Sequence, residues 1–390
     1  MYPRLCKPLL NQSFFLFGPR GVGKTWLLRR IFADSNRVAT VNLLKEELYL
    51  ELLTRPSTLR QFLSIDGELA EWVVIDEVQR VPALLNEVHD ILEDPNYHRK
   101  IKFALTGSSA RKLKRGGADM LAARALVNDL HSLSLLEVGD DWQLSQALRW
   151  GTLPAVVTAE SNEQRAEILR SYVSTYVKEE IKEEQIVRKL EPFVRFLEAA
   201  AQANGQPVAF SKIGDAALVD QKAVGRYFEI LEDTLLGFFL PAFTRSARQR
   251  TILSSKFYFF DIGVKNALEK NITSDLRHGT SEWGRAFEHH VVLECLKLNS
   301  YHRKDARFSH LRTKDGAELD LIIELPKQKP LCVEIKSSRT VTVKDLAALK
   351  AITEAVDGGI PILVYDGEQE RNENGVSVLP WKKFLEQVWR

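Results

Sequence analysis

The sequence contains a glycine-rich segment of the kind that wraps around the phosphates of a nucleotide. Residues 18–25 read Gly-Pro-Arg-Gly-Val-Gly-Lys-Thr and match the pattern GxxxxGK[ST]. Glycines let such a loop turn so that its backbone N–H groups point inward at the phosphates. We expect Lys24 to reach the β- and γ-phosphates and Thr25 to ligate Mg²⁺. A glycine turn without a ligand is the alternative interpretation.

The surroundings of this segment favour the nucleotide interpretation. An apolar run, Phe14–Phe17, precedes it and a helical pattern, Trp26–Phe32, follows it, as the phosphate loop requires. The N-terminus of that helix adds a positive dipole end. The sequence therefore predicts ATP as ligand together with Mg²⁺. The residues expected to contact the nucleotide here are Gly18, Pro19, Arg20, Gly21, Val22, Gly23, Lys24, Thr25 and Trp26.

An acidic pair follows a second apolar run. Trp72–Ile75 reads as a buried strand, and Asp76 and Glu77 come directly after it. Ligands bind at the carboxyl ends of parallel strands, so this is a suitable place for catalytic carboxylates. We expect Asp76 to hold Mg²⁺ through water and Glu77 to orient and deprotonate the attacking water. An acidic pair that caps a helix is the alternative.

Hydroxyl groups end a third strand, and an arginine follows further along. Lys102–Leu105 leads into Thr106, the residue we favour as a sensor of the γ-phosphate or of the attacking water. Ser108 and Ser109 are the rival residues, and a polar turn is the alternative for all of them. Arg124 is a candidate contact to the γ-phosphate, in its own subunit or in a neighbouring one of a homo-oligomer. An ordinary surface arginine on a helix fits its sequence equally well.

A second set of chemically competent residues lies near the C-terminus. Asp320 lies in one strand-like segment, and Glu334 and Lys336 lie on one face of the next. If the two strands pair, these side chains form a hard-oxygen site for Mg²⁺ or Mn²⁺ that would polarise a phosphate. Lys336 would position or deprotonate the attacking water, or stabilise the charge. Glu288, on the preceding helix, would add a ligand.

The bare pattern of Asp followed by Glu-x-Lys is common at charged strand ends. The order of elements adds weight to it: a helix with Glu288, the strand of Asp320, a turn, the strand of Glu334, a helix and a last strand. That order predicts a nuclease-like domain, whereas an intact metal site and actual cleavage are further steps. His289 and His290 are adjacent and point in different directions on the helix, so we expect surface or packing residues rather than ligands.

The elements that must position these residues fall into three regions. Strand candidates interleaved with helices predict an α/β region with a parallel, doubly wound sheet at 1–160. A helical region at 161–250 has the outline of a winged helix. A second α/β region with a restriction-endonuclease-like order occupies 251–390. The strands expected in the first region are Ser13–Phe17, Val38–Leu43, Trp72–Ile75, Lys102–Leu105 and Leu126–Leu130.

The middle region is predicted from caps and amphipathic patterns. Glu163–Glu184 reads as one long helix and Phe193–Ala203 as another. Ser211 is expected to cap a short helix, and Asp220 is expected to cap one that runs to about residue 232. The apolar stretch after it suits one or two strands. In the third region we expect Lys256–Phe260, Trp283–Leu298, Phe308–Arg312, Leu319–Glu324, Leu331–Ile335, Thr342–Ala355 and Pro361–Tyr365.

Composition excludes several classes of protein. The 390 residues are 45% apolar and 27% charged, which rules out wholesale disorder, collagen-like repeats and a disulfide scaffold. The net charge of +2 neither demands nor forbids a polyanionic partner. Three widely separated cysteines, with no CxxC pair, argue against a zinc site and indicate a reducing, cytoplasmic location. No apolar run approaches the roughly 18 residues of a membrane span, so no membrane association is expected.

With these motifs, the chain resembles a large family of predicted prokaryotic AAA-type ATPases. In that family a P-loop domain precedes a winged-helix region and a C-terminal domain similar to PD-(D/E)xK nucleases. The resemblance implies that Lys24, Thr25, Asp76 and Glu77 carry ATP hydrolysis. It also implies a nuclease-like centre at Asp320, Glu334 and Lys336. The matching segments are Gly18–Thr25, Val73–Arg80, Leu105–Ser109, Leu121–Ala125, Tyr172–Glu180, Tyr227–Glu232, Lys256–Gly263, Gly284–Glu288 and Glu318–Lys336.

The segment around Arg124 departs from the family pattern. Leu121-Ala-Ala-Arg124 has alanine where relatives usually have a glycine before the arginine. Whether the second helix of the winged-helix region binds DNA or packs against protein is left open by its charges. Its basic residues are interspersed with acidic ones, whereas DNA-reading helices usually carry more positive charge. These residues are Gln221, Lys222, Arg226, Glu229, Glu232 and Asp233. Two other basic clusters, Arg111–Arg115 and Arg245–Arg250, would meet phosphates nonspecifically or form solvated faces.

Three functional hypotheses follow. The first is an ATPase whose nucleotide state governs a metal-dependent, DNA-directed nuclease-like domain. The second is a nucleotide-dependent switch or scaffold whose C-terminal domain binds nucleic acid or a protein partner without cutting. The third is a DNA-binding regulator that uses the winged helix, in which case Arg226 would take part in sequence-selective binding.

Overall fold

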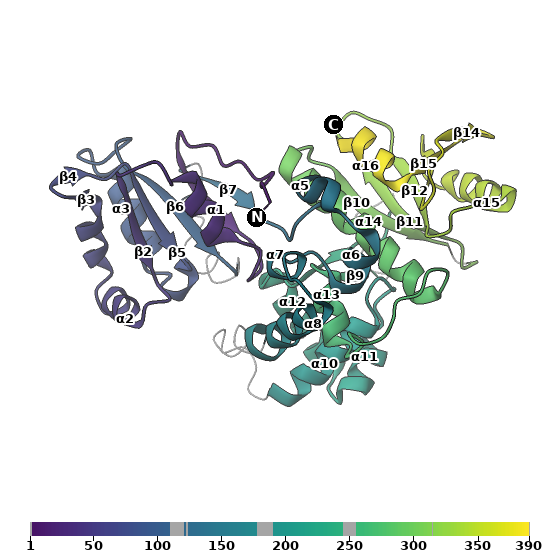
Figure 1. The fold of residues 1–390 in the computed structure, drawn as a ribbon, viewed down its shortest axis with the longest axis horizontal. Coiled ribbons are helices and arrows are strands. Elements are labelled where there is room, and N and C mark those ends of the chain that lie inside the picture. The colour runs from purple at the N-terminus through teal and green to yellow at the C-terminus, as the bar shows by residue number, and fades with distance from the viewer. Residues whose placement is uncertain are drawn as a thin grey trace. The chain divides into compact units, whose positions relative to one another are not determined.

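The computed structural model describes residues 2–109, 121, 124–177, 190–244, 255–313 and 315–389 (Figure 1). The chain divides into two compact units. The first unit comprises Tyr2–Leu133 with Asp233–Leu236, and the second comprises Ser134–Glu232 and Gly237–Arg390. The structure thus groups most of the predicted middle region with the C-terminal region, and the second unit already begins at Ser134.

The first unit is built on a parallel sheet, as predicted. Its five strands run in the order β2-β5-β6-β1-β7, and every neighbouring pair is parallel. Every residue of β1 and β5 is buried, which explains why these strands read as continuous apolar runs rather than alternating ones. The strands are β1 (Ser13–Phe17), β2 (Val38–Asn42), β5 (Trp72–Asp76), β6 (Lys102–Gly107) and β7 (Ala125–Asp129).

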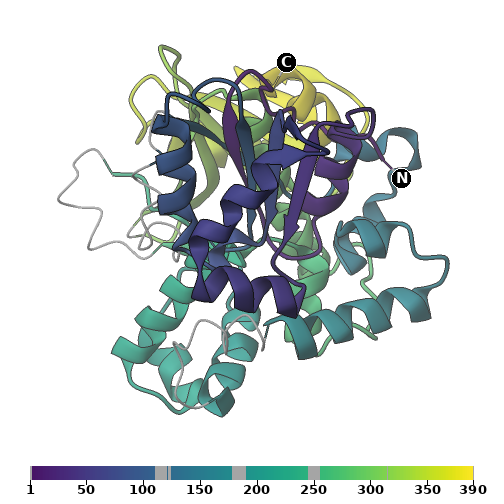
Figure 2. The ribbon, with the colours of Figure 1, turned by 90° about the vertical axis from the view of Figure 1, so that its left-hand side faces the viewer.

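Helices cover this sheet and close its core. The core contains Val41 and Phe103 from the strands, Leu59 from η1, and Leu85 and Val88 from α3. In Figure 2 the helices from α2 to α3 lie in front of the purple and blue strands. The elements are α1 (Lys24–Ile31), α2 (Glu46–Thr54), the 3₁₀ helices η1 (Pro56–Leu63) and η2 (Val78–Arg80), the short strands β3 (Ser64–Ile65) and β4 (Glu68–Leu69), and α3 (Leu84–Glu93).

The second unit begins with helices. The long helix predicted at Glu163–Glu184 is α8, which passes directly into the π-helical turn η5 at Tyr172; residues 178–184 lie outside the described residues. The elements are α5 (Leu135–Val138), η4 (Gly139–Asp141), α6 (Leu144–Trp150), α7 (Pro154–Val157), α8 (Asn162–Ser171), η5 (Tyr172–Val177), α10 (Leu190–Gln202), α11 (Phe210–Ala217), α12 (Gln221–Asp233) and α13 (Ile262–Leu268).

One predicted helix cap is confirmed and one is wrong. Asp220 caps α12, because its carboxylate accepts a hydrogen bond from the backbone N–H of Ala223 at 2.7 Å. Ser211 does not cap α11: that helix begins at Phe210, and Ala209, which precedes it, supplies no side-chain cap. The helix therefore begins two residues earlier than expected, and its first residue, Phe210, stacks on Phe228 of α12 with ring centroids 5.7 Å apart.

A small antiparallel sheet packs with α10–α12. Strands β8 (Gly237–Leu240) and β9 (Lys256–Phe259) pair, and Pro207 makes an isolated antiparallel bridge to Lys256. An aromatic cluster joins the sheet to the helices: Phe228 contacts Phe196, Phe239 and Phe257 at centroid distances of 4.9, 5.3 and 4.8 Å. This cluster holds the position of β9, which carries residues important below.

The C-terminal part of the second unit is a mixed sheet of six strands in the order β10-β11-β12-β13-β15-β14. Strands β10 and β12 run antiparallel to β11, whereas β12, β13 and β15 are mutually parallel. The last three elements extend the predicted order. The elements are α14 (Ser281–His302), β10 (Arg307–Arg312), β11 (Glu318–Glu324), β12 (Leu331–Lys336), α15 (Val343–Thr353), β13 (Ile360–Tyr365), β14 (Arg371–Glu373), β15 (Val376–Pro380) and α16 (Trp381–Trp389).

Candidate functional site

The glycine-rich loop joins β1 to α1, and its glycines are required by its geometry. Gly21 and Gly23 have φ of 78° and 96°, a region that side chains with a Cβ rarely adopt. A Cβ on Gly18 would lie 2.2 Å from the carbonyl oxygen of Leu130, so the loop packs against the end of β7. The loop is also braced by Arg4, which donates to the carbonyls of Val22 and His131, each at 2.6 Å. Sequence analysis missed Arg4, because nothing in its neighbourhood marks it.

Lys24 is held at this loop. Its side chain is buried, and its Nζ donates to the carbonyl oxygens of Gly18 at 2.8 Å and Pro19 at 3.1 Å. The same ammonium lies 3.9 Å from Oε1 of Glu77. Burying a lysine is costly unless anions or dipoles compensate it, and here loop carbonyls and a carboxylate do so. The structure therefore brings Lys24 and Glu77 together, as the sequence predicts.

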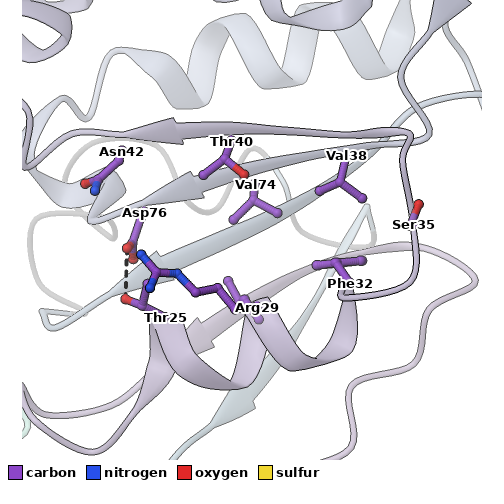
Figure 3. Close-up of a pocket in the computed structure, with 10 residues that line it drawn as sticks. Thr25, Arg29, Phe32, Ser35, Val38, Thr40, Asn42, Val74 and Asp76 are labelled. Carbon is purple, nitrogen blue, oxygen red and sulfur yellow. Dashed lines mark hydrogen bonds between the residues drawn. The ribbon is translucent and has the colours of Figure 1, made fainter. Parts of the chain in front are cut away.

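Thr25 and Asp76 meet directly. Thr25 Oγ1 donates to Oδ2 of Asp76 at 2.8 Å, which Figure 3 shows as a dashed line. Asp76 is buried at the end of β5, while Thr25 is the second residue of α1. A hydroxyl and a carboxylate in contact at the carboxyl edge of a parallel sheet offer two adjacent oxygens to a hard cation. These two side chains are suitable ligands for the Mg²⁺ ion that accompanies a nucleoside triphosphate.

Thr106 lies beside the acidic pair. It is fully buried near the end of β6, where it donates to Oδ1 of Asp76 and accepts from the backbone N–H of Glu77 at 2.9 Å. Its hydroxyl thus contacts the carboxylate of Asp76 and the backbone of Glu77, and its role as a sensor stays a prediction. The rival residue Ser108 donates to Oε2 of Glu77 at 3.2 Å. Ser109 is buried and makes no side-chain hydrogen bond within the described chain.

Glu77 is also oriented by a residue that sequence analysis missed. Gln79 Nε2 donates both to Oε2 of Glu77 and, at 2.9 Å, to Oγ of Ser108. Glu77 itself has a left-handed backbone, with φ of 63° and ψ of 47°. Non-glycine residues in this region cost free energy, and functional sites are where such strain is usually kept. The position of Gln79, two residues after Glu77, was the available signal.

A cavity of about 250 Å³ opens beside Thr25 and Asp76 (Figure 3). It lies between α1 and the face of β2 and β5 that α2 and α3 do not cover. In Figure 3 the guanidinium of Arg29 lies near the Thr25–Asp76 pair. The lining residues are Thr25, Leu28, Arg29, Phe32, Ser35, Val38, Thr40, Asn42, Val74 and Asp76.

Arg124 lies away from the phosphate loop, so a contact to the nucleotide of its own subunit is contradicted. It directly precedes β7, whose first residue is in register with Ser13 at the start of β1, so it lies at the amino end of the parallel strands. The phosphate loop leaves their carboxyl end. Nε of Arg124 contacts Oε1 of Glu93 at 2.6 Å. The hydrogen bond and charge of Arg124 lower the pKa of Glu93.

The second unit brings the predicted C-terminal residues together. Asp320 on β11 accepts a hydrogen bond from the backbone N–H of Ile335 through Oδ2 at 2.8 Å. On β12, Nζ of Lys336 contacts Oε1 of Glu334 at 2.8 Å. Burial and the neighbouring charges of Glu288 and Glu334 raise the pKa of Asp320 well above its ordinary value. Glu288, on α14, belongs to the same cluster.

Two further members of this cluster come from β9 and were missed. Nζ of Lys256 lies 2.9 Å from Oε1 of Glu288 and 4.0 Å from Oδ1 of Asp320. The hydroxyl of Tyr258 donates to the same Oε1 of Glu288 at 2.6 Å. Burial opposes the charge of Lys256, but Glu288 and Asp320 outweigh it and raise its pKa. Burial also raises the pKa of Tyr258, and the charge of Glu288 adds to this shift.

Metal binding by Asp320, Glu334 and Glu288 stays a prediction. Within the described residues, no group of three or more His, Cys, Asp or Glu side chains is arranged to hold a metal ion. Positive charge is already present among the carboxylates, since Lys256 and Lys336 each contact one of them. The residues are gathered as predicted, but as an ion-pair network.

The remaining candidates have structural roles or lie outside the description. His289 and His290 are buried packing residues, so their predicted role is confirmed. On α12, Lys222 and Arg226 are exposed, and so are Gln221, Glu229 and Glu232, which leaves a face of mixed charge. Arg111–Arg115 and Arg245–Arg250 lie outside the described residues.

Three segments of the chain match known family models. Residues 10–139 match the family model of an AAA domain. Residues 141–275 match a domain of unknown function, DUF8612, and residues 283–384 match another, DUF4143. Uncharacterized proteins of Mycobacterium bovis and Mycobacterium tuberculosis are each 27% identical over 337 residues, covering 84% of this chain and 71% of theirs.

Solved structures with a related arrangement include a Walker-type ATPase of Pyrococcus abyssi. It is 15% identical with a TM-score of 0.43, and the match covers 66% of this chain and 90% of that one. The Orc1 protein of Aeropyrum pernix, solved in complex with DNA, is 15% identical with a TM-score of 0.32, covering 68% and 87%. No helix in the described part of the chain combines the length and apolar character needed to cross a membrane.

Proposed function

We propose that the protein binds ATP with Mg²⁺ and hydrolyses it, because residues 10–139 match the family model of an AAA domain. The hydrogen bond between Thr25 and Asp76 is the observation that carries this proposal. It places a loop hydroxyl and a strand carboxylate side by side at the edge of the sheet where the phosphate loop begins. Mg²⁺ bound there would neutralise charge on the β- and γ-phosphates.

The side chains around this pair divide the chemical work. Lys24 would leave its loop carbonyls to contact the β- and γ-phosphates, and the loop N–H groups would bind the remaining phosphate oxygens. Glu77 would accept a proton from the attacking water. Gln79 and Ser108 contact its Oε2, so they orient the base, while Thr106 holds Asp76 and the backbone of Glu77 in place.

Two substitutions test this assignment. Glu77→Gln should keep ATP binding and lower phosphate release by roughly 100-fold or more, because the general base is lost. Lys24→Ala should abolish detectable binding of a fluorescent ATP analogue. Glu68→Gln, an exposed residue in the same unit, is the matched control and should change neither value. Wild-type hydrolysis by both Glu77→Gln and Lys24→Ala would refute the assignment.

For the second unit we propose that the nucleotide state controls the C-terminal domain. The order α14, β10, β11, β12, α15, β13 supports a nuclease-like fold, and α10–α12 with β8 and β9 supports a winged helix. DNA is the proposed partner, with a protein partner as the alternative. A homo-oligomer would bring Arg124 of one subunit to the nucleotide of another. Lys256 within the carboxylate cluster favours binding without cleavage over a metal-dependent cut.

Cleavage assays distinguish these two forms of the proposal. Plasmid and single-stranded DNA would be incubated with the wild type, Asp320→Ala and Lys336→Ala in Mg²⁺ or Mn²⁺, with and without ATP. Cutting that only the wild type performs supports the nuclease. ATP turnover with nucleotide-dependent DNA retention and no cutting by any protein supports the switch.

A further inference from the structure

We propose that Lys256 is the resident cation of the C-terminal carboxylate cluster and keeps divalent metal ions out of it. Glu288, Asp320 and Glu334 approach one another from α14, β11 and β12, an arrangement that needs positive charge. Lys256 supplies it from β9, and its side chain is only 2% exposed. This inference concerns the cluster alone and does not depend on ATP hydrolysis.

The hydrogen bonds of the carboxylates support this reading. Oε1 of Glu288 accepts from both Lys256 Nζ, at 2.9 Å, and Tyr258 OH, at 2.6 Å. Oδ2 of Asp320 accepts from the backbone N–H of Ile335, and Oε1 of Glu334 is bound by Lys336. Each carboxylate therefore commits one oxygen to a donor of the chain, which leaves fewer oxygens for a metal ion.

Size and charge point the same way. Mg²⁺ requires oxygen ligands at about 2.0–2.1 Å in a near-octahedral shell. The ammonium of Lys256 lies between the carboxylates that would supply such ligands, 2.9 Å from Glu288 and 4.0 Å from Asp320. A divalent cation bound to those same oxygens would lie within a few ångströms of the buried ammonium of Lys256, and burial of that ammonium weakens the screening of the repulsion.

The backbone of β9 holds Lys256 in this position. Lys256 is in register with Leu240 of β8 and forms the bridge to Pro207 on its other side. Two residues further on, Tyr258 reaches the same glutamate, because alternate residues of a strand point to one face. The cluster is thus assembled from two sheets, and the small sheet next to α10–α12 provides the positive charge.

Manganese binding, measured by electron paramagnetic resonance without nucleotide, tests the proposal. An Asp76→Asn background removes the ligand at the phosphate loop. In that background, protein that retains Lys256 should show no Mn²⁺ binding that depends on Asp320. Lys256→Met should gain one binding site for Mn²⁺, because the carboxylates lose their cation. The dissociation constant of that site should be at least about tenfold lower than a millimolar value. Adding Asp320→Asn should abolish that gain.

Controls keep the outcome decisive. Lys256→Arg retains the charge and should remain without Mn²⁺. Lys270→Met removes a lysine from an exposed ion pair with Glu198 and should also gain nothing. The proposal is overturned if protein that retains Lys256 binds Mn²⁺ and loses that binding on Asp320→Asn. It is also overturned if Lys256→Met folds but gains no Mn²⁺ binding. Should Lys256→Met not fold, the first of these comparisons decides alone. ATP binding by the parent chain, measured separately, tests the phosphate loop independently.

Discussion

The hydroxyl of Thr106 links the two acidic residues of the proposed nucleotide site, since it donates to the carboxylate of Asp76 and accepts from the backbone N–H of Glu77 at 2.9 Å. This relationship arises from the strand order. β6 lies between β1, which leads into the phosphate loop, and β5, which ends in the acidic pair. Thr106, near its carboxyl end, therefore reaches the carboxylate of Asp76 and the backbone of Glu77.

Thr106→Val should lower ATP turnover by roughly tenfold or more with little change in ATP affinity, because a misplaced base affects the chemical step more than binding. The buried N–H of Glu77 would lose its acceptor, which costs about 1–3 kcal/mol of unfolding free energy. Thr106→Ser keeps the hydroxyl and should restore both values. Phosphate release and urea unfolding measure the two effects. If Thr106→Val is as active and as stable as Thr106→Ser, the hydroxyl of Thr106 does not orient Asp76 or the backbone of Glu77.

The sheet and the elements that carry the proposed nucleotide site were predictable because their signals are local. The buried parallel strands appear as continuous apolar runs, and the loop and the acidic pair directly follow two of them. The choice between Thr106 and Ser108 was not decidable from the sequence. They are two residues apart, and only the structure shows that each contacts a different part of the acidic pair.

Arg124→Ala should leave the dissociation constant of ATP unchanged within about twofold in dilute protein, because Arg124 is at the sheet edge opposite the phosphate loop. Its exposed pair with Glu93 contributes at most about 1 kcal/mol to stability. If subunits assemble, ATP turnover by Arg124→Ala should fall. It should recover when this variant is mixed with Lys24→Ala, whose subunits supply an intact arginine. Equilibrium binding of ATP is the direct measurement. A tenfold loss of affinity in the isolated chain would contradict the observed position.

The C-terminal cluster shows where sequence reasoning reached its limit. The order of helix and strands correctly brought Glu288, Asp320, Glu334 and Lys336 together, since paired neighbouring strands are a local feature. Lys256 lies in another sheet, well before them in the sequence, and a single lysine in an apolar strand carries no pattern. The predicted metal site stays a prediction, and the counter-charge that this distant residue supplies could not be anticipated from the sequence.

Asp320→Asn should stabilise the protein at neutral pH by about 1 kcal/mol, as often happens when a charged functional residue is neutralised. Burial, with the charges of Glu288 and Glu334, raises the pKa of Asp320. The folded state then binds this proton more strongly than the unfolded state, so ionised Asp320 lowers stability as the pH rises above 3.8. The asparagine keeps an acceptor for the N–H of Ile335.

Urea unfolding at pH 7.5 and at pH 4 measures this gain, which should shrink at the lower pH, where the wild-type carboxyl is protonated. Asp315→Asn, at an exposed residue of the same region, is the control and should behave as the wild type at both pH values. A loss of stability in Asp320→Asn at pH 7.5 would mean that the cluster favours the ionised form.

His289→Gln should make the protein more resistant to acid. Nε2 of His289 contacts the carbonyl of Phe259 at 2.7 Å, and Nδ1 contacts Nδ2 of Asn204 at 3.2 Å, which fits a neutral ring that donates to the first and accepts from the second. Burial lowers the pKa of His289 to about 3. Between that value and 6.5 the unfolded state holds a proton that the folded state lacks, so stability falls as the pH drops.

From pH 7.5 to pH 5 this group should reduce the unfolding free energy by on the order of 2 kcal/mol, a loss that glutamine avoids because its amide can make both contacts without titrating. Burial lowers the pKa of His290 in both proteins, so the difference between them isolates His289. Urea unfolding at the two pH values provides the measurement, with His98→Gln, an exposed histidine, as control. Equal acid sensitivity of His289→Gln and the wild type would show that the ring is not held neutral by the fold.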